Sequence, residues 1–178
     1  MTIRALVFIA TSLDGFIARE DGSLDWLPAP SSEEDYGYTE FMARVDVLVM
    51  GRKTYETALG FGEWPYSGKR VVVLSSTLAA GDIPSSLHGK VEIDAGPLPE
   101  LVQRLEAEGH KGIYVDGGKT IQSFLNAGLI DEIIITRIPI LLGSGIPLFD
   151  DLAHDIHLQH LGTKNYASGF VQNHYRVI

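Results

Sequence analysis

A strand passes into a helix within the segment Val45-Asp46-Val47-Leu48-Val49-Met50-Gly51-Arg52-Lys53-Thr54. The apolar, largely β-branched run from Val45 to Met50 predicts a buried strand. Gly51 ends that run, and a helical turn is expected from Lys53 to Ala58. A glycine turn between a buried strand and a helix is typical of α/β proteins, in which helices cover a largely parallel sheet.

The same alternation of strand and helix continues on both sides of this segment. Short apolar runs predict buried strands at residues 3–10, 71–74, 90–93, 112–115 and 132–138. Helices are expected from a cap at Ser31 or Ser32 to about Arg44, over 98–105 with a stop at Gly109, and around 121–125 before Gly128. Residues 11–30 are rich in Gly, Asp, Ser and Pro and predict one long loop, which in a compact domain is usually functional.

The end of the chain has a different pattern. Ile156–Thr163 and Phe170–Ile178 alternate with period two around a turn at Asn165–Gly169, which predicts an antiparallel hairpin. We therefore expect a three-layer α/β/α fold with a mostly parallel sheet that is closed by a C-terminal antiparallel hairpin. Residues 1–178 are expected to form a single domain, since no linker or repeat interrupts them.

Composition excludes several classes of protein. The net charge of −9 and the absence of a basic run argue against nucleic-acid binding, because an acidic surface repels phosphate backbones. No apolar run approaches the roughly 20 residues that span a bilayer, so no membrane association is expected. The chain has no cysteine, which excludes disulfides and a catalytic thiol and favours a cytoplasmic location. His154, His157 and His160 are spaced by three on or near a strand, where alternate faces prevent convergence, so no metal site is expected.

Three predicted strand ends are followed by groups that can hold phosphate. The first is Gly51-Arg52-Lys53-Thr54, the second is the hydroxyl run Ser75-Ser76-Thr77, and the third is Asp116-Gly117-Gly118-Lys119-Thr120. Ligands of open α/β sheets bind outside the carboxyl ends of the strands, where free backbone N–H groups of helix starts are available. Each motif alone is weak, because a turn with a solvated cation or a polar exit from a sheet has the same sequence.

In their order, these motifs resemble the dihydrofolate-reductase superfamily. The resemblance rests on Ser12-Leu13-Asp14-Gly15-Phe16-Ile17-Ala18, Asp21-Gly22, Asp25-Trp26-Leu27, Val49-Met50-Gly51-Arg52-Lys53-Thr54-Tyr55, Val73-Leu74-Ser75-Ser76, Asp116-Gly117-Gly118 and Ile135-Thr136. Phe124–Glu132 and Pro139–Gly145 are similar to one branch, the reductase domain of riboflavin biosynthesis. That branch implies an NADPH-dependent reductase like 5-amino-6-(5-phosphoribosylamino)uracil reductase, which transfers hydride to a pyrimidine- or pterin-type heterocycle. A dihydrofolate reductase and a catalytically silent, dimeric nucleotide-binding protein are the alternatives.

The resemblance also implies a cofactor site for NADPH. Its residues are Ala10, Ile17, Gly51, Arg52, Lys53, Thr54, Leu74, Ser75, Ser76, Val115, Gly117, Gly118, Lys119 and Thr120. Arg52 with Ser75 or Ser76 would bind the 2′-phosphate, because an Arg fork and hydroxyls form charge-assisted hydrogen bonds with a dianion. Gly117 and Gly118 would admit the cofactor close to the backbone, and the resemblance allows a cis peptide bond between Asp116 and Gly117.

For proton transfer and substrate binding, the resemblance points to four polar side chains. Asp35 aligns with the buried carboxylate of folate reducers and Thr136 with its hydroxyl partner, although Asp35 fits the first turn of a helix equally well. Asp116 and Asp14 are expected near the substrate, and Asp14 is equally plausible as a turn residue.

Two further positions concern the substrate itself. Lys69 takes the place of the arginine that binds the folate tail, and Trp26 is a candidate for stacking on a ligand ring. The apolar segment 138–148 would form a homodimer surface or be buried within the monomer.

Overall fold

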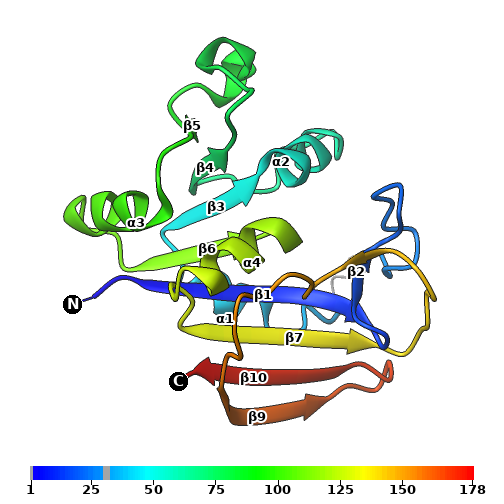
Figure 1. Cartoon of the computed structure of the whole chain (residues 1–178). Helices are drawn as coiled ribbons and strands as arrows, with labels where there is room; N and C mark the ends of the chain where they lie inside the picture. Colours follow the sequence, from blue (N-terminus) through cyan, green and yellow to red (C-terminus); the bar gives the residue numbers. More distant parts are fainter. Residues whose placement is uncertain (1, 30–32) are drawn as a thin grey trace.

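The computed structural model describes residues 2–29 and 33–178, and its centre is an eight-stranded sheet of order β5-β4-β3-β6-β1-β7-β10-β9 (Figure 1). The strands of this sheet are β1 (Arg4–Ser12), β3 (Val47–Gly51), β4 (Arg70–Leu74), β5 (Val91–Asp94), β6 (Gly112–Asp116), β7 (Glu132–Ile138), β9 (Leu158–Asn165) and β10 (Val171–Val177). The first six are parallel, whereas β10 is antiparallel to both β7 and β9. The predicted mostly parallel sheet with a C-terminal hairpin is therefore confirmed.

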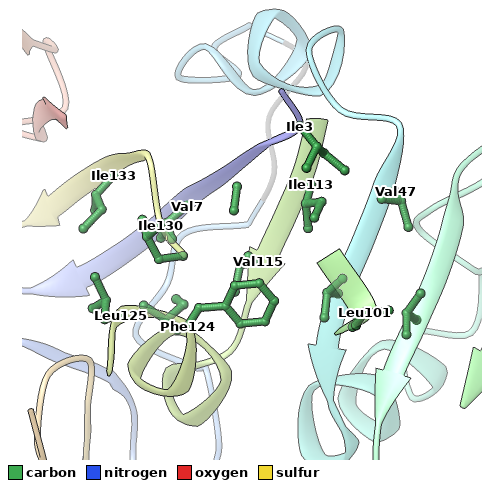
Figure 2. Packing of buried hydrophobic residues seen from close by; sticks show 14 of the residues in the cluster. Ile3, Val7, Val47, Leu101, Ile113, Val115, Phe124, Leu125, Ile130 and Ile133 are labelled. Carbon is green, nitrogen blue, oxygen red and sulfur yellow. The ribbon is translucent and has the colours of Figure 1, made fainter. Parts of the chain in front are cut away.

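Helices lie on both faces of the sheet. One face packs against α3 (Leu98–Ala107) and α4 (Gly118–Asn126), whose residues Leu101 and Phe124 are buried in one cluster with strand residues such as Val7 and Val115 (Figure 2). Leu105 of α3 belongs to the same cluster. These positions follow the helical period of three and four that the sequence shows. The other face packs against α1 (Tyr38–Met42) and α2 (Arg52–Leu59), and it forms a second apolar cluster.

The helix expected before β3 is much shorter than predicted. The helix expected to run to Arg44 is only five residues long, and it begins at Tyr38 because Tyr36 and Gly37 adopt positive φ of 53° and 82°. An α-helix cannot pass through left-handed residues, so the preceding segment is irregular. The expected caps, Ser31 and Ser32, lie outside the described residues.

The long segment 11–30 is not wholly a loop, because it contains the short strand β2 (Phe16–Ala18). β2 pairs with β8 (Ile146–Pro147) in a second, two-stranded antiparallel sheet. A strand of three residues has too short an alternation to be detected from sequence. Two short 3₁₀-helices, η1 (Ala80–Asp82) and η2 (Ser85–Leu87), complete the described elements. Within the described ranges, no helix is long and apolar enough to cross a membrane.

Candidate functional site

The three predicted turns meet along one edge of the sheet. β4, β3 and β6 are neighbours in the sheet, and their registers place Leu74 beside Gly51 and Met50 beside Asp116. Because the strands are parallel, the turns that follow them leave from the same edge (Figure 1). The structure thus brings the Arg52, Ser75 and Gly117 segments together, as the sequence predicted.

The sheet opens at this edge between β6 and β1. β1 pairs with β6 only from Arg4 to Leu6, whereas it pairs with β7 as far as Ser12. Beyond Leu6 the two strands are joined instead by the Tyr114 hydroxyl, which donates to the Phe8 carbonyl at 2.9 Å. The backbone near Ala10 is therefore paired on the β7 side only, at the position in the strand order where open α/β sheets bind ligands.

A cluster of one cation and several hydroxyls follows β3 and β4. Arg52 donates from Nη1 to Thr77 Oγ1 at 2.8 Å and from Nε to Glu56 Oε1 at 2.6 Å. Ser75 Oγ lies 3.3 Å from Thr77 Oγ1. Ser75 and Ser76 also line an open groove of about 470 Å³ beside the ends of β4 and β5. This groove is large enough for part of a nucleotide, and its lining residue Ser75 lies beside the Thr77 hydroxyl that binds Arg52.

The glycine turn after β6 is packed tightly against threonine side chains. Gly117 has a φ of 94°, and a Cβ there would lie 2.5 Å from Thr54 Oγ1. A Cβ at Gly51 would lie 3.1 Å from Thr120 Oγ1. Packing and a positive φ therefore favour glycine at 117, and Gly51 is tightly packed, a reason that the sequence did not reveal. The peptide bond between Asp116 and Gly117 is trans, so the suggestion of a cis bond is wrong.

Asp116 is the carboxylate with the most perturbed environment at this edge. Burial raises its pKa to about 6, since desolvation disfavours the charged form. The Gly117 amide, which donates to Oδ1 at 2.9 Å, and the neighbouring Tyr66 hydroxyl offset that rise only in part. Tyr38 also lies close enough for the Asp116 charge to raise its pKa, after burial as the larger cause. Asp116 can therefore hold a proton near neutral pH.

Asp14 joins two loops beside this edge. Its carboxylate accepts hydrogen bonds from Ser12 Oγ at 2.6 Å, from the Gly143 amide at 2.8 Å and from the Leu142 amide at 3.2 Å. These bonds lower its pKa, with the Ser12 hydroxyl as the main cause. The structure favours the turn role of Asp14 over a role in proton transfer, because its acceptor sites are occupied by the chain itself.

The two joined loops cover the start of α4. The loop strands β2 and β8 pair there, and the Ile17 side chain lies against Gly118 so closely that a Cβ on that glycine would be 2.8 Å from Ile17 Cδ1. The two ends of the segment 138–148 are buried at Ile138 and Leu148, whereas Pro139, Leu141, Gly143 and Ser144 between them are exposed. The structure thus buries the ends of the segment and leaves much of its middle at the surface.

Asp35 and Thr136 are not joined in the structure. Asp35 is exposed, and its pKa is lowered mainly by the Thr39 side chain and also by the Thr39 and Gly37 amides, each of which donates to its carboxylate at 2.9 Å. Its carboxylate therefore binds amides at the start of α1, whose N-cap is Gly37, and is not a buried proton donor. The buried Thr136 hydroxyl instead accepts a hydrogen bond from Gln172 Nε2 at 2.9 Å.

The two candidate substrate residues have different surroundings. Trp26 is buried next to Ile138 and Phe170, and its indole N–H has no partner among the described residues. Lys69 lies at the amino end of β4, where Nζ donates to the main-chain carbonyls of Met42 and Val45. That position is at the opposite end of the strand from the candidate site, so the structure does not bring Lys69 to it.

A family model for the C-terminal domain of RibD matches residues 5–172 of this chain. The chain belongs to the RibD C-terminal domain family. This family is the reductase domain of riboflavin biosynthesis, and membership confirms the resemblance that the sequence motifs indicated.

Relatives of this RibD-family chain include both free-standing and larger proteins. "Uncharacterized protein YwjB" of Bacillus subtilis is 38% identical over 98% of both chains. The "Putative riboflavin biosynthesis protein" of Shewanella sp. PV-4 has a crystal structure with a TM-score of 0.91, 43% identity and 99% coverage of both chains. The riboflavin biosynthesis protein RibD of Corynebacterium ammoniagenes is 29% identical over 83% of this chain, but the match covers only 45% of that protein. The RibD of Acinetobacter baumannii, at 18% identity and a TM-score of 0.74, shares the fold.

Three residues that contact candidate site residues were not themselves predicted as site residues: Thr77 contacts Arg52, Gln172 contacts Thr136, and Tyr66 contacts Asp116. Thr77 belongs to the hydroxyl run that the sequence singled out, and its contact with Arg52 depends on the side-chain direction. Gln172 lies on an inward-facing position of the alternating β10, a signal that the sequence does contain. Tyr66 lies in the loop between α2 and β4, where no periodicity indicates that it reaches Asp116.

Proposed function

We propose that this chain is an NADPH-dependent reductase that transfers hydride to a small pyrimidine- or pterin-type heterocycle. The observation that carries the proposal is the arrangement along one sheet edge. A guanidinium and hydroxyl cluster with a groove lies at the ends of β3 and β4, and a protonatable acid lies at the end of β6 beside the opening to β1. A dinucleotide needs a long site of this kind, with phosphate contacts at one part and a reactive ring at another.

The residues of the edge fit NADPH rather than NADH. Arg52 and the Ser75-Ser76 hydroxyls would hold the 2′-phosphate, because a guanidinium forms charge-assisted hydrogen bonds with a dianion. Glu56 keeps the Arg52 side chain in place and leaves Nη2 and part of Nη1 for a ligand. Thr54, Thr120 and the backbone amides at the starts of α2 and α4 would hold the pyrophosphate, since helix starts offer free N–H groups. Lys53 and Lys119 are exposed beside them and add positive charge.

The nicotinamide end of the proposed site lies at the opening between β6 and β1. NADPH, when bound, supplies the hydride. The main chain of Ala10 and Ile17 would bind the carboxamide, and the loops joined by Asp14 would exclude water from the ring. Asp116 would deliver the proton that accompanies reduction, because its carboxyl remains partly protonated near neutral pH.

The proposal is tested by calorimetric titration with NADPH and NADH, followed by NADPH oxidation with a panel of pyrimidine and pterin substrates. We expect NADPH to bind at least about tenfold more tightly than NADH, because only NADPH has the 2′-phosphate that can form a charge-assisted hydrogen bond with Arg52. Absence of NADPH binding would overturn the proposal. Tight binding without turnover of any substrate in the panel would support the silent nucleotide-binding protein instead.

A further inference from the structure

A second cavity lies on the other side of the molecule from the groove, between α1 and the antiparallel end of the sheet. Its volume is about 260 Å³. Phe8, Phe41 and Ile134 form an apolar floor, and Arg44 and Lys164 lie at its polar side. None of the residues that line it is among those proposed to bind NADPH, although Gln172 donates to the hydroxyl of Thr136, a candidate for proton transfer.

A glycine on the edge strand creates this space. Phe8, Ile134, His174 and Gly162 form one row across β1, β7, β10 and β9, because each is the register partner of the next. Register partners direct their side chains to the same face of a sheet, so a side chain at 162 would point into the cavity. A Cβ built on Gly162 meets no atom within 4 Å, and the backbone there has no positive φ that would demand glycine.

One side of the cavity carries two cationic side chains, Arg44 and Lys164, although the chain has a net charge of −9. Beside it, the buried Glu132 carboxylate is bonded by Arg4 and by Arg44, the latter at 2.7 Å, and by His174 at 2.9 Å. Two guanidinium groups facing one carboxylate leave one positive charge uncompensated. Lys164, which forms no ion pair with a described residue, adds a second.

Acidic side chains also lie near these cations. Glu40 of α1 lines the cavity, and the Asp35 carboxylate accepts a hydrogen bond from the amide of Gly37, another lining residue. The local placement of Arg44 and Lys164 on one side of the cavity is therefore what favours an anionic ligand. The combination of an apolar floor and a cationic side matches a ligand with a flat apolar body and one anionic group.

We propose that this cavity binds a small aromatic carboxylate of about one ring. The size agrees, since an apolar cavity of about 150 Å³ accepts benzene and the additional volume accommodates a carboxylate. The ring would lie on Phe8, Phe41 and Ile134, and the carboxylate would bind Arg44 and Lys164. One terminal nitrogen of Arg44 is used by Glu132, which leaves its other N–H groups for the ligand.

The test is a titration of the isotope-labelled protein with benzoate, followed by two-dimensional amide NMR at constant ionic strength. We expect saturable shifts at Phe41, Gln172 and His174, which line the cavity. Benzylamine, which has the same ring and the opposite charge, should bind at least about tenfold more weakly. Equal binding of the two compounds, or benzoate shifts centred elsewhere, would overturn the proposal, as would the absence of any shift.

Matched variants separate filling of the cavity from changes in stability. Gly162→Ile should weaken benzoate binding at least about tenfold, because the added side chain occupies the space that the ring needs. Gln159→Ile adds the same side chain on the same strand away from the cavity and should change binding less than about twofold. Lys164→Gln should weaken binding about threefold, as an exposed ion pair allows. Unchanged binding in both Gly162→Ile and Lys164→Gln would refute the site even if NADPH binds as proposed.

Discussion

Replacement of Asp116 by asparagine isolates the effect of burying an acid at the end of β6. Burial raises the pKa of Asp116 from 3.8 to about 6. The folded state therefore binds the proton more tightly than the unfolded chain does, and the stability that this provides is present below about pH 4 and is lost as the pH rises through about 6. Asparagine keeps the shape of the neutral acid and does not ionise, so it avoids this loss.

The size of the effect follows from the shift. Each pKa unit corresponds to about 1.36 kcal/mol, so a rise from 3.8 to about 6 costs the folded wild type about 3 kcal/mol at pH 8. The free energy of unfolding of Asp116→Asn, relative to that of wild type, should therefore increase by about 3 kcal/mol as the pH rises from about 4 to about 8. Contributions of other ionisable groups cancel in this difference, because both proteins share them.

The assay is urea unfolding of both proteins across this pH range, with Asp150→Asn as the control. Asp150 is exposed, so its substitution should leave the difference from wild type nearly independent of pH. A change of less than about 1 kcal/mol for Asp116→Asn would refute the buried-acid reasoning. In the proposed reaction, the same variant should bind NADPH normally and lose about a hundredfold or more in turnover, because asparagine cannot deliver a proton.

Four further substitutions test other parts of the structure. Arg52→Ala should weaken NADPH binding by about 1.5–3 kcal/mol and NADH binding far less in calorimetric titrations, and an equal loss for both would remove Arg52 from the 2′-phosphate. Asp14→Asn places a side-chain amide N–H against a loop amide N–H, so it should lower the free energy of unfolding by about 1–2 kcal/mol and accelerate hydrogen exchange in residues 140–148. Unchanged exchange would contradict the role of Asp14 in joining the two loops. Gly112→Ala places a Cβ 2.0 Å from a backbone carbonyl and should lower stability by about 2 kcal/mol or more, whereas Gly81→Ala, with open space around it, should be nearly neutral in thermal unfolding. Asp35→Asn should cost less than about 1 kcal/mol of stability and leave turnover unchanged, and a large loss of turnover would restore Asp35 to the mechanism.

The sequence predicted the layers and the sheet but not the irregular segments. β7, from Glu132 to Ile138, coincides with its prediction because a continuous apolar run is a strong signal for a buried strand. The helix before β3 was predicted too long because nothing in its sequence reveals the positive φ of Tyr36, an unusual conformation for a residue with a side chain. β2 was missed because its order depends on pairing with β8, which lies more than a hundred residues away in the chain.

The sequence predicted where the candidate site lies but not which side chains contact one another within it. Neighbouring parallel strands bring Arg52, Ser75 and Gly117 to one edge, so the motifs mark the edge at which the candidate site lies. The surroundings of individual acids do not follow from motifs. Asp35 aligns with a buried acid but is exposed, because it lies in the irregular segment before the short helix α1 and its carboxylate accepts from the Thr39 amide.

The separation of β1 from β6 accounts for the remaining features of the edge. The pairing of β1 with β6 ends at Leu6 and Tyr114. Beyond this point β6 stays paired with β3 as far as Asp116, and β1 stays paired with β7 as far as Ser12. Asp116 at the end of β6 thus lies beside an opening in the sheet and is partly exposed, while desolvation of its carboxyl still raises its pKa to about 6. An acid on a fully paired central strand would be buried without access to a ligand, and one on an exposed loop would have an ordinary pKa. The break in pairing is therefore what allows a carboxyl group at this position to be both protonated and reachable.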